Sequence, residues 1–327
     1  MNKEDLRIVI FGTSDFGCPT VDVLMMNDYN IVGIITKPDV YNVRKKQNIP
    51  TPMKEKAMER GIPVLMPTDL KDEKFLSDLK KMDGNVFVVI AFQMLPKEVF
   101  EMPKYGTFNI HASTLPDYRG AAPINWAIAN GEKRIGMTSF FINEKMDDGK
   151  IIYQTSIPNY SNRNFTQLYD ILKVAVCGNL CCETLNKIVE SNGNPITLTQ
   201  DPSRCFHKAP KLNHENTKLD LTKNIDDIFN HIKAFSLKPG AWCLIQSEDK
   251  FNEKSIKILG GEIISFGHHK GFERETAYFS IVDGNILMFA GDGCIKVTML
   301  QLEGSKVMTP KDFINGYGDF LEKWMLV

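Results

Sequence analysis

Short apolar runs alternate with amphipathic stretches through the first half of the chain. The strand-like runs are Arg7 to Phe11, Ile31 to Thr36, Val86 to Ala91 and Thr107 to His111. This alternation is typical of βαβ units, which assemble into a parallel sheet covered by helices. The third run is apolar at every position, as a central strand with helices on both faces requires. We therefore expect an α/β domain with a Rossmann-like, doubly wound, mostly parallel sheet.

Two further strand-like segments and a long helix follow. Met137 to Phe141 and Ile151 to Ser156 have the composition of strands, and the polar loop Asn143 to Lys150 separates them. Loops at strand ends commonly carry functional residues, so this loop is a candidate for chemistry. Between Asn164 and Val189, apolar residues recur at three- and four-residue spacing, which predicts one continuous helix that closes the first domain.

The pattern changes after this helix. Glu190 to Gln200 contains Asn192-Gly193-Asn194-Pro195, which has turn-forming residues and no apolar period. One helical stretch, Ile225 to Ala234, then precedes short β segments separated by the hairpin signals Asp283-Gly284-Asn285 and Asp292-Gly293. Such strands predict a small β-barrel of a kind that includes oligonucleotide-binding folds. The predicted regions are a first domain over 1–189, a linker over 190–206 and a C-terminal β-barrel domain over 207–327.

The composition is that of an ordinary globular protein. Of the 327 residues, 43% are hydrophobic and 24% charged, and the formal net charge is -1. This balance argues against a uniformly basic surface that coats nucleic acid, so any contact with RNA should be local. The charged start of the chain, and the lack of an apolar run of about 20 residues, indicate neither a signal peptide nor a transmembrane helix. We therefore expect a cytoplasmic protein.

The cysteines are scattered and odd in number. Three of the seven, Cys177, Cys181 and Cys182, lie on the long predicted helix, and no Cys-x-x-Cys pair occurs. We interpret them as small apolar core residues in a reducing compartment rather than as metal ligands or redox groups.

A glycine-containing turn, Gly12-Thr13-Ser14-Asp15-Phe16-Gly17, follows the first predicted strand, where a phosphate-binding loop would lie. The dinucleotide fingerprint needs a third glycine between these two, and the P-loop needs a lysine where this chain has Cys18. We therefore interpret the segment as a tight turn between a strand and a helix.

The strongest local signal for chemistry is the segment Phe108 to Pro116, followed by the turn-rich segment Asp117 to Pro123. Successive side chains of a strand point to opposite faces, so Asn109 and His111 share one face. They also lie at the carboxyl end of their strand, where open α/β sheets bind ligands. A single histidine on a strand is more often structural than catalytic, but the amide on the same face and the Gly- and Pro-rich turn favour catalysis here.

The loop between the two later strands supplies an acidic pair, Asp147 and Asp148, and the residues alone do not distinguish them. Asn, His and Asp side chains at one sheet edge suit the transfer of a carbonyl group to an amine. The amide can hydrogen-bond to the carbonyl oxygen, and the histidine can donate a proton or stabilise an oxyanion. The carboxylate can orient the imidazole and favour its charged form. This chemistry uses no metal.

The segment Asn109-Ile110-His111-Ala112-Ser113-Thr114-Leu115-Pro116 resembles the signature of the 10-formyltetrahydrofolate-dependent formyltransferases, which usually reads Asn-x-His-x-Ser-Leu-Leu-Pro. Met146-Asp147-Asp148-Gly149 is similar to the family's Leu-Asp-x-Gly loop, and this resemblance selects Asp147. It implies that Asn109, His111 and Asp147 carry out formyl transfer. It also implies 10-formyltetrahydrofolate as co-substrate, in a pocket formed by Phe92, Gln93, Met94, Leu95, Ser113, Thr114, Leu115 and Pro116.

Other segments resemble those family members whose acceptor is methionyl-initiator tRNA. Gly12 to Phe16 is similar to their Gly-Thr-Pro-Asp-Phe opening, and Arg44, Lys45 and Lys46 lie where they carry a tRNA-contacting basic loop, without its usual flanking glycines. By composition alone, three adjacent cations are more often a solvated surface. Further resemblance is carried by Ala209 to Leu212, Ile232 to Phe235 and Pro239 to Trp242. The resemblance covers nearly the whole chain and implies initiator tRNA as a partner.

Two other functions stay open. The family also contains enzymes that formylate a sugar nucleotide or glycinamide ribonucleotide, and the basic loop and C-terminal segments argue against these acceptors. A tRNA-binding protein without catalysis would need only the barrel and the basic loop, and the set of Asn109, His111 and Asp147 argues against it. We expect a monomer that does not associate with a membrane.

Overall fold

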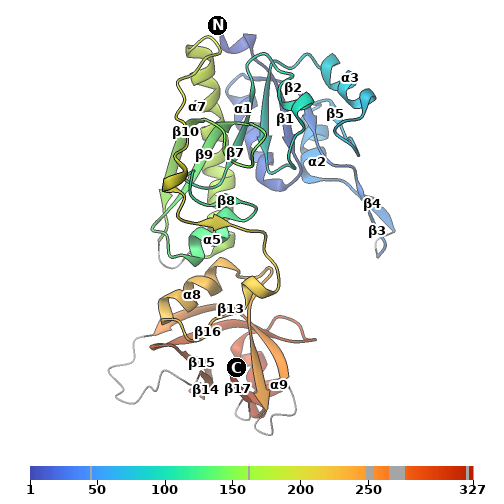
Figure 1. Ribbon diagram of the computed structural model, residues 1–327. Coiled ribbons are helices and arrows are strands. Elements are labelled where there is room, and N and C mark those ends of the chain that lie inside the picture. Colours follow the sequence, from blue (N-terminus) through green and yellow to red (C-terminus); the bar gives the residue numbers. More distant parts are fainter. Residues whose placement is uncertain (45, 161–162, 248–252, 265–276, 322–323, 327) are drawn as a thin grey trace. The chain divides into compact units, whose positions relative to one another are not determined.

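The chain folds into two compact units. The computed structural model describes residues 1–44, 46–160, 163–247, 253–264, 277–321 and 324–326. Unit 1 comprises Met1–Pro123, Arg134–Ile157 and Tyr169–Lys208, and unit 2 comprises Ile124–Lys133, Pro158–Leu168 and Ala209–Val327 (Figure 1). The chain therefore passes between the units several times.

Unit 1 is built on a seven-stranded sheet with the strand order β10-β9-β7-β6-β1-β2-β5. These strands are β1 (Arg7–Gly12), β2 (Asn30–Ile35), β5 (Val64–Leu65), β6 (Val86–Ile90), β7 (Thr107–His111), β9 (Arg134–Phe141) and β10 (Ile151–Pro158). β5, β2, β1, β6 and β7 are parallel, and β9 runs antiparallel to β7. The predicted Rossmann-like, mostly parallel sheet is confirmed, with small differences at the strand ends and with β5 added.

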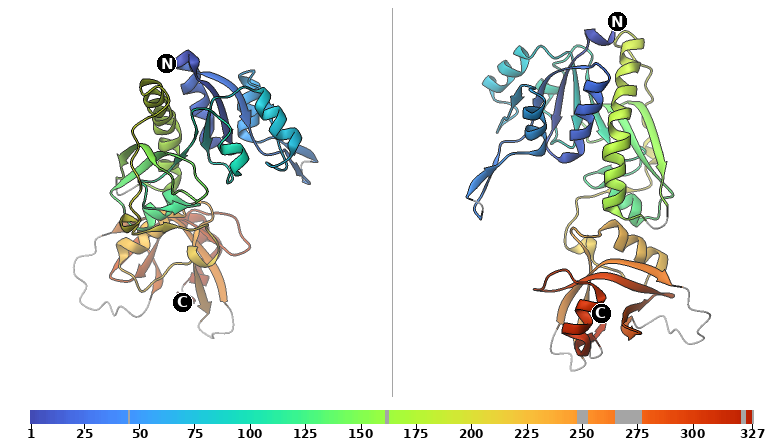
Figure 2. Two further views of the ribbon diagram at one scale, coloured as in Figure 1. Left: turned by 45° about the horizontal axis from the view of Figure 1, so that its top comes forward. Right: turned by 180° about the vertical axis from the view of Figure 1, so that it is seen from behind.

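Helices cover both faces of this sheet, which explains why β1 and β6 are buried almost throughout. The helices of this part of the chain are α1 (Cys18–Met26), α2 (Pro52–Glu59), α3 (Glu73–Lys81), α4 (Lys97–Phe100) and α7 (Cys177–Glu190). On one face, Phe75 of α3 and Val99 of α4 pack with Phe11 and Phe87 of the sheet. On the other, α7 lies beside α1 (Figure 2). A Cβ at Gly178 would lie 2.7 Å from the Val23 side chain, so glycine permits this close helix packing.

The predicted long helix is interrupted. It consists of α6 (Phe165–Ile171), a π-helical turn (Leu172–Val176) and α7. The expectation of one continuous α-helix was wrong in this respect, because a π turn inserts a single extra residue and three- and four-residue spacing does not resolve that insertion. Lys173, within the π turn, forms an ion pair with Asp15 at 2.8 Å.

Unit 2 contains a closed barrel with the strand order β12-β13-β16-β15-β14-β17. The strands are β12 (Ala241–Ser247), β13 (Glu253–Ile264), β14 (Tyr278–Val282), β15 (Asn285–Ala290), β16 (Gly293–Leu302) and β17 (Trp324–Leu326), and the helices are α5 (Pro123–Ala129), α8 (Ile225–Ala234) and α9 (Pro310–Leu321). Both hairpin signals join neighbouring strands, and Asp283 and Gly284 have the positive φ values of such turns. The predicted barrel is confirmed.

Two small sheets complete the fold of the described residues. β3 (Val40–Asn42) and β4 (Gln47–Ile49) form an antiparallel hairpin that projects from the body of unit 1 (Figure 1). β8 (Arg119–Gly120) pairs with β11 (Lys208–Ala209). No helix in the described part of the chain is long and apolar enough to cross a membrane.

Candidate active site

The carboxyl ends of β1, β6 and β7 lie at one edge of the sheet, because these strands are parallel neighbours. The chain adds β2 on one side of β1 and β6 on the other, so the strand order reverses at β1. In open α/β sheets, ligands bind outside the carboxyl ends of the strands at such a switch point. The segment after β6 and the last residues of β7 both lie at this edge.

β7 presents the two residues that the sequence predicts to act together. Asn109 pairs with Val89 of β6 and Phe140 of β9, so it is anchored within the sheet. Its side-chain amide has no hydrogen-bond partner among the described residues, which leaves it available to a ligand. His111, 7% exposed, has Nε2 2.9 Å from the Tyr118 carbonyl oxygen. A carbonyl only accepts, so Nε2 carries a hydrogen in this contact.

The two neighbouring aspartates have different partners. The Asp147 carboxylate accepts from the Gly120 N–H at 3.0 Å and lies 3.9 Å from His111 Nδ1. The Asp148 carboxylate instead pairs with Arg119 Nη1 at 2.6 Å. The gap between His111 and Asp147 is longer than a hydrogen bond, and catalytic hydrogen bonds are often long until substrate binds. The geometry therefore pairs His111 with Asp147 and occupies Asp148 elsewhere.

A residue that the sequence did not single out, Gln200, holds this acidic loop. Its Nε2 donates to the carbonyl oxygens of Asp147 at 2.9 Å and Gly149 at 2.8 Å. Its Oε1 accepts from Arg119 Nη2 at 2.6 Å and Nε at 3.1 Å. Gln200 lies in the segment predicted to be a linker, where a single polar residue among turn formers carries no signal. Leu198 nearby pairs with Ile151, which ties this segment to β10.

Gly149 ends the loop at a position that only glycine can fill. A Cβ there would lie 1.6 Å from the Phe141 carbonyl oxygen, far inside any allowed contact. Asp147 itself has a φ of 51°, in the left-handed region that non-glycine residues seldom adopt. The loop is thus held in a specific shape by its surroundings.

The segment after β6, where part of the folate pocket is predicted, alternates between core and surface. Leu95 is 4% exposed and belongs to the core, and the ring of Phe92 meets Phe11 edge to face with the centroids 5.7 Å apart. Gln93 is exposed and Met94 is 64% exposed. Gln93 and Met94 are therefore the side chains of this segment that are free to contact a ligand, and the other two support them.

The second predicted folate segment is largely an internal scaffold. Ser113 is buried and donates from Oγ to the Asp117 carbonyl oxygen at 2.7 Å, and Leu115 packs with Phe140 and Ile151. Thr114 is exposed and Pro116 is half-buried. Direct side-chain contacts with a ligand would thus fall to Thr114 and Pro116.

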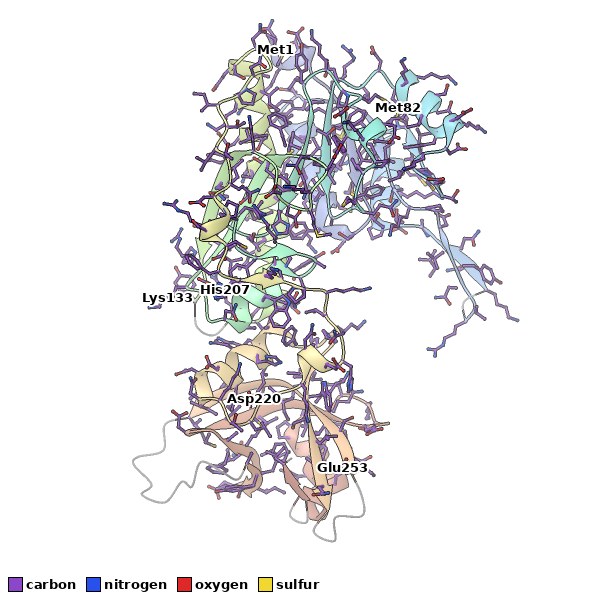
Figure 3. The ribbon with its side chains drawn as sticks, viewed as in Figure 1. Met1, Met82, Lys133, His207, Asp220 and Glu253 are labelled. Carbon is purple, nitrogen blue, oxygen red and sulfur yellow. The ribbon has the colours of Figure 1, made fainter. Side chains whose placement is uncertain are left out.

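The turn after Pro116 is held by hydrogen bonds from Phe206 and His207, at the end of the 190–206 region. The backbone N–H groups of Phe206 and His207 donate to Asp117 Oδ1 at 2.7 and 2.8 Å. The ring of His207, labelled in Figure 3, stacks on Tyr118 with the centroids 5.2 Å apart. The same Tyr118 supplies the carbonyl that orients His111, so this brace supports the site.

The predicted tRNA-binding cations lie on a separate element. Arg44 and Lys46 are exposed at the tip of the β3–β4 hairpin, and Lys45 lies outside the described residues. The base of the hairpin is fixed by a hydrogen bond between the Thr36 and Thr51 hydroxyls at 2.7 Å. An ion pair between Lys54 and Asp39, also 2.7 Å long, adds to it. The tip is therefore a solvated projection on an anchored base.

The remaining predicted features have structural explanations. Gly12 ends β1 and a Cβ there would lie 3.1 Å from the Ile90 carbonyl oxygen, which agrees with a tight strand-to-helix turn. All seven cysteines are described and are free thiols. Burial raises the pKa of Cys177 to about 12 and that of Cys181 well above its usual value, as expected of core residues. Among the described residues, no group of three or more His, Cys, Asp or Glu could hold a metal ion.

Comparison with known proteins gives matches along the whole length. The formyl transferase family model matches residues 6–175, and the model for the formyl transferase C-terminal domain matches 211–318. A methionyl-tRNA formyltransferase of Flavobacterium johnsoniae is 41% identical over 313 residues, which cover 96% of each chain. One of Parabacteroides distasonis is 36% identical over 331 residues, which cover 98% of this chain and 99% of that one.

Solved structures share the fold at lower identity. An N-formyltransferase from Helicobacter canadensis in complex with folinic acid and dTDP-3-aminofucose aligns with a TM-score of 0.62 and 19% identity, covering 89% of this chain and 99% of that one. HypX from Aquifex aeolicus in complex with tetrahydrofolic acid aligns with a TM-score of 0.63 and 15% identity, covering 97% of this chain and 48% of that one. The structural matches support the fold, and the sequence matches establish the kinship. The chain belongs to the methionyl-tRNA formyltransferase family.

Proposed function

We propose that this protein transfers the formyl group of 10-formyltetrahydrofolate to the amino group of methionyl-initiator tRNA, giving N-formylmethionyl-tRNA for translation initiation. The observation that carries the proposal is that Asp147 faces His111 across 3.9 Å, at the end of the strand that also carries Asn109. It occurs in a chain that matches relatives named for this reaction over 96% of its length. We also propose that the enzyme is cytoplasmic and acts as a monomer.

Each of the three side chains has its own role in the reaction. The methionine amine attacks the formyl carbon, a new C–N bond forms, and the carbonyl oxygen gains negative charge. The Asn109 amide and the protonated His111 ring stabilise that oxyanion. Asp147 orients the His111 ring and accepts the proton that the amine loses. The tetrahedral intermediate then collapses, the bond to the folate nitrogen breaks, and the proton that Asp147 accepted passes to that nitrogen, which leaves as tetrahydrofolate.

Both substrates have proposed binding surfaces. The folate binds at the edge formed by residues 92–95 and 113–116, with Gln93, Met94, Thr114 and Pro116 as the accessible side chains. The tRNA binds through Arg44, Lys45 and Lys46, whose charges can contact phosphates, and through the C-terminal barrel domain over 207–327. We propose that residues 1–189 carry the catalytic machinery and that residues 190–206 serve as the linker.

One assay with three acceptors tests the proposal. The protein is incubated with 10-formyltetrahydrofolate and either methionyl-initiator tRNA, an amino-sugar nucleotide or glycinamide ribonucleotide, and the formylated products are quantified. We expect formylmethionine from the tRNA and at most trace product from the others. Transfer to either small acceptor, or tRNA binding without transfer to any acceptor, would refute the proposed function.

A further inference from the structure

We propose that Gln200 is a positioning residue for formyl transfer, which fixes the 147–149 loop so that the Asp147 carboxylate, rather than that of Asp148, faces His111. The inference rests on the role proposed above for Asp147. It concerns a residue outside the signature segments, in the region that follows α7.

The acidic loop needs an external restraint. Asp147 has a positive φ and its carboxylate accepts a hydrogen bond from Gly120, while the adjacent Asp148 carboxylate is paired with Arg119. The two side chains are identical and adjacent in the chain, so the path of the backbone decides which one faces His111. The side-chain contacts alone therefore do not explain why Asp147, rather than Asp148, stays opposite His111.

Gln200 supplies the restraint through the backbone. Its one amide nitrogen donates to the carbonyl oxygens of Asp147 and Gly149, which lie on either side of Asp148. The side chain is 6% exposed, so water competes little for these bonds. The peptide plane between the two aspartates and the one that follows Gly149 are thus held from one point.

Arg119 fixes the direction of the Gln200 amide. Two of its N–H groups donate to Oε1, so the NH₂ group must face the loop carbonyls. A flipped amide would place Oε1 against two carbonyl oxygens. Arg119 is also next to Tyr118, whose carbonyl holds His111, and to Gly120, whose N–H holds Asp147. Gln200 therefore acts through a segment that contacts both members of the His–Asp pair.

The variant Gln200→Glu isolates this role. Glutamate has the same length and keeps an acceptor for Arg119, but it replaces the NH₂ donor with an oxygen that repels the two carbonyls. We expect kcat to fall by about tenfold to a hundredfold, with little change in KM for either substrate, because a misplaced catalytic group slows the chemical step. The matched control is Asn179→Asp, which breaks a 2.9 Å amide bond to the Ala175 carbonyl on the exposed side of α7 and should leave kcat unchanged.

A second measurement needs no substrate. Exchange of the Gly120 amide hydrogen reports on Asp147, because that N–H donates to the Asp147 carboxylate. We expect faster exchange at Gly120 in Gln200→Glu than in the wild type or Asn179→Asp. Arg119→Lys, which keeps a cation for Asp148 but not the planar fork on Gln200, should show the same change with a smaller loss of kcat. This variant serves if Gln200→Glu does not fold.

The outcomes separate this inference from the proposed function. Loss of kcat together with faster Gly120 exchange supports positioning by Gln200. Wild-type kcat in Gln200→Glu, or reduced kcat with unchanged Gly120 exchange, overturns it. If the wild-type protein formylates no methionyl-tRNA, the proposed function fails, while the exchange measurement still decides whether Gln200 holds Asp147.

Discussion

Adjacent residues with the same side chain have different environments in this protein. Asp147 faces His111 across 3.9 Å, whereas Asp148 is paired with Arg119 at 2.6 Å. The residue pattern alone could not separate them, because the choice depends on contacts from residues about 30 and 50 positions away in the chain. Resemblance to a known loop selected Asp147, and the geometry is consistent with that selection.

The residues of β7 give the first prediction. Asn109→Ala removes a donor to the oxyanion, and His111→Ala removes the charged group that also stabilises it. Each variant should lower kcat by about a hundredfold or more, as loss of such a group commonly does. Steady-state formylation of methionyl-initiator tRNA measures the effect, and tetrahydrofolate binding by calorimetry serves as the control that the fold is kept. A kcat within a few-fold of wild type in either variant is incompatible with the proposed mechanism.

His231 on α8 gives a prediction about pH. Burial lowers its pKa from 6.5 to about 4, and its ring lies edge to face with Phe235. Because the unfolded chain binds this proton more readily, the contribution to stability is full above pH 6.5 and is lost as the pH falls towards 4. The loss is at most about 3.5 kcal/mol, at about 1.4 kcal/mol per pKa unit.

Chemical unfolding between pH 7 and pH 4 checks this prediction. His231→Gln, which cannot titrate, should show a smaller decrease in the free energy of unfolding over this range than the wild type. Parallel curves for the two proteins would show that His231 does not cause the acid sensitivity.

The helices and strands that could be predicted from the sequence are those with a clear local pattern of apolar residues. The longer strands of the unit 1 sheet and α8 were predicted because apolar spacing reports burial directly, as in the fully buried run of β6. β8 and β11 escaped, since strands of two residues have no period and are defined by their pairing with each other. The contacts of Gln200 were not predicted either, because they join segments that are distant in the chain.

The β3–β4 hairpin gives a prediction about tRNA. Replacing Arg44, Lys45 and Lys46 with Ala should weaken tRNA binding and flatten its dependence on salt, because each lost phosphate contact lowers the slope by about 0.7 to 0.9. The KM for folate should stay unchanged, since the hairpin is a separate element on its own anchored base. Binding is measured between about 50 and 200 mM salt, the range over which such contacts have a large effect.

A matched variant controls for net charge. Lys71, Lys74 and Lys80 are exposed cations on and beside α3, and their replacement with Ala removes the same charge from another surface. An equal effect of the two triple variants on the salt slope would argue that the protein attracts tRNA by overall charge and that the hairpin has no special role.

At the scale of the whole molecule, the chain passes between two units in a way that no local pattern reports. Residues 124–133 and 158–168 group with unit 2, although the sequence assigns them to the catalytic domain. Apolar spacing identifies a helix such as α5 but not the core that it joins. Apolar spacing alone therefore does not reveal that two internal segments belong to the second unit.

Limited proteolysis tests the proposed linker over 190–206. Leu198 and Gln200 are held by backbone pairing and buried hydrogen bonds, whereas Arg204 is exposed and Phe206 is 76% exposed. Within this region we expect the first cut by trypsin after Arg204, because exposed segments are cleaved preferentially. Mass spectrometry of the fragments locates the cuts. Early cleavage between 195 and 200 would show that this half of the region is not held as described.

The rate of a single turnover tests most directly whether Asp147, and not Asp148, takes part in formyl transfer. Enzyme in excess over methionyl-initiator tRNA is mixed with saturating 10-formyltetrahydrofolate, and N-formylmethionyl-tRNA is followed for the wild type, Asp147→Asn and Asp148→Asn. We predict rapid transfer by the wild type and a loss of about a hundredfold or more in Asp147→Asn. Asp148→Asn should lose less than about tenfold, because a partly exposed ion pair contributes up to about 1 kcal/mol. Equal rates in the two variants, or no formylation of the tRNA by the wild type, would contradict the central claim.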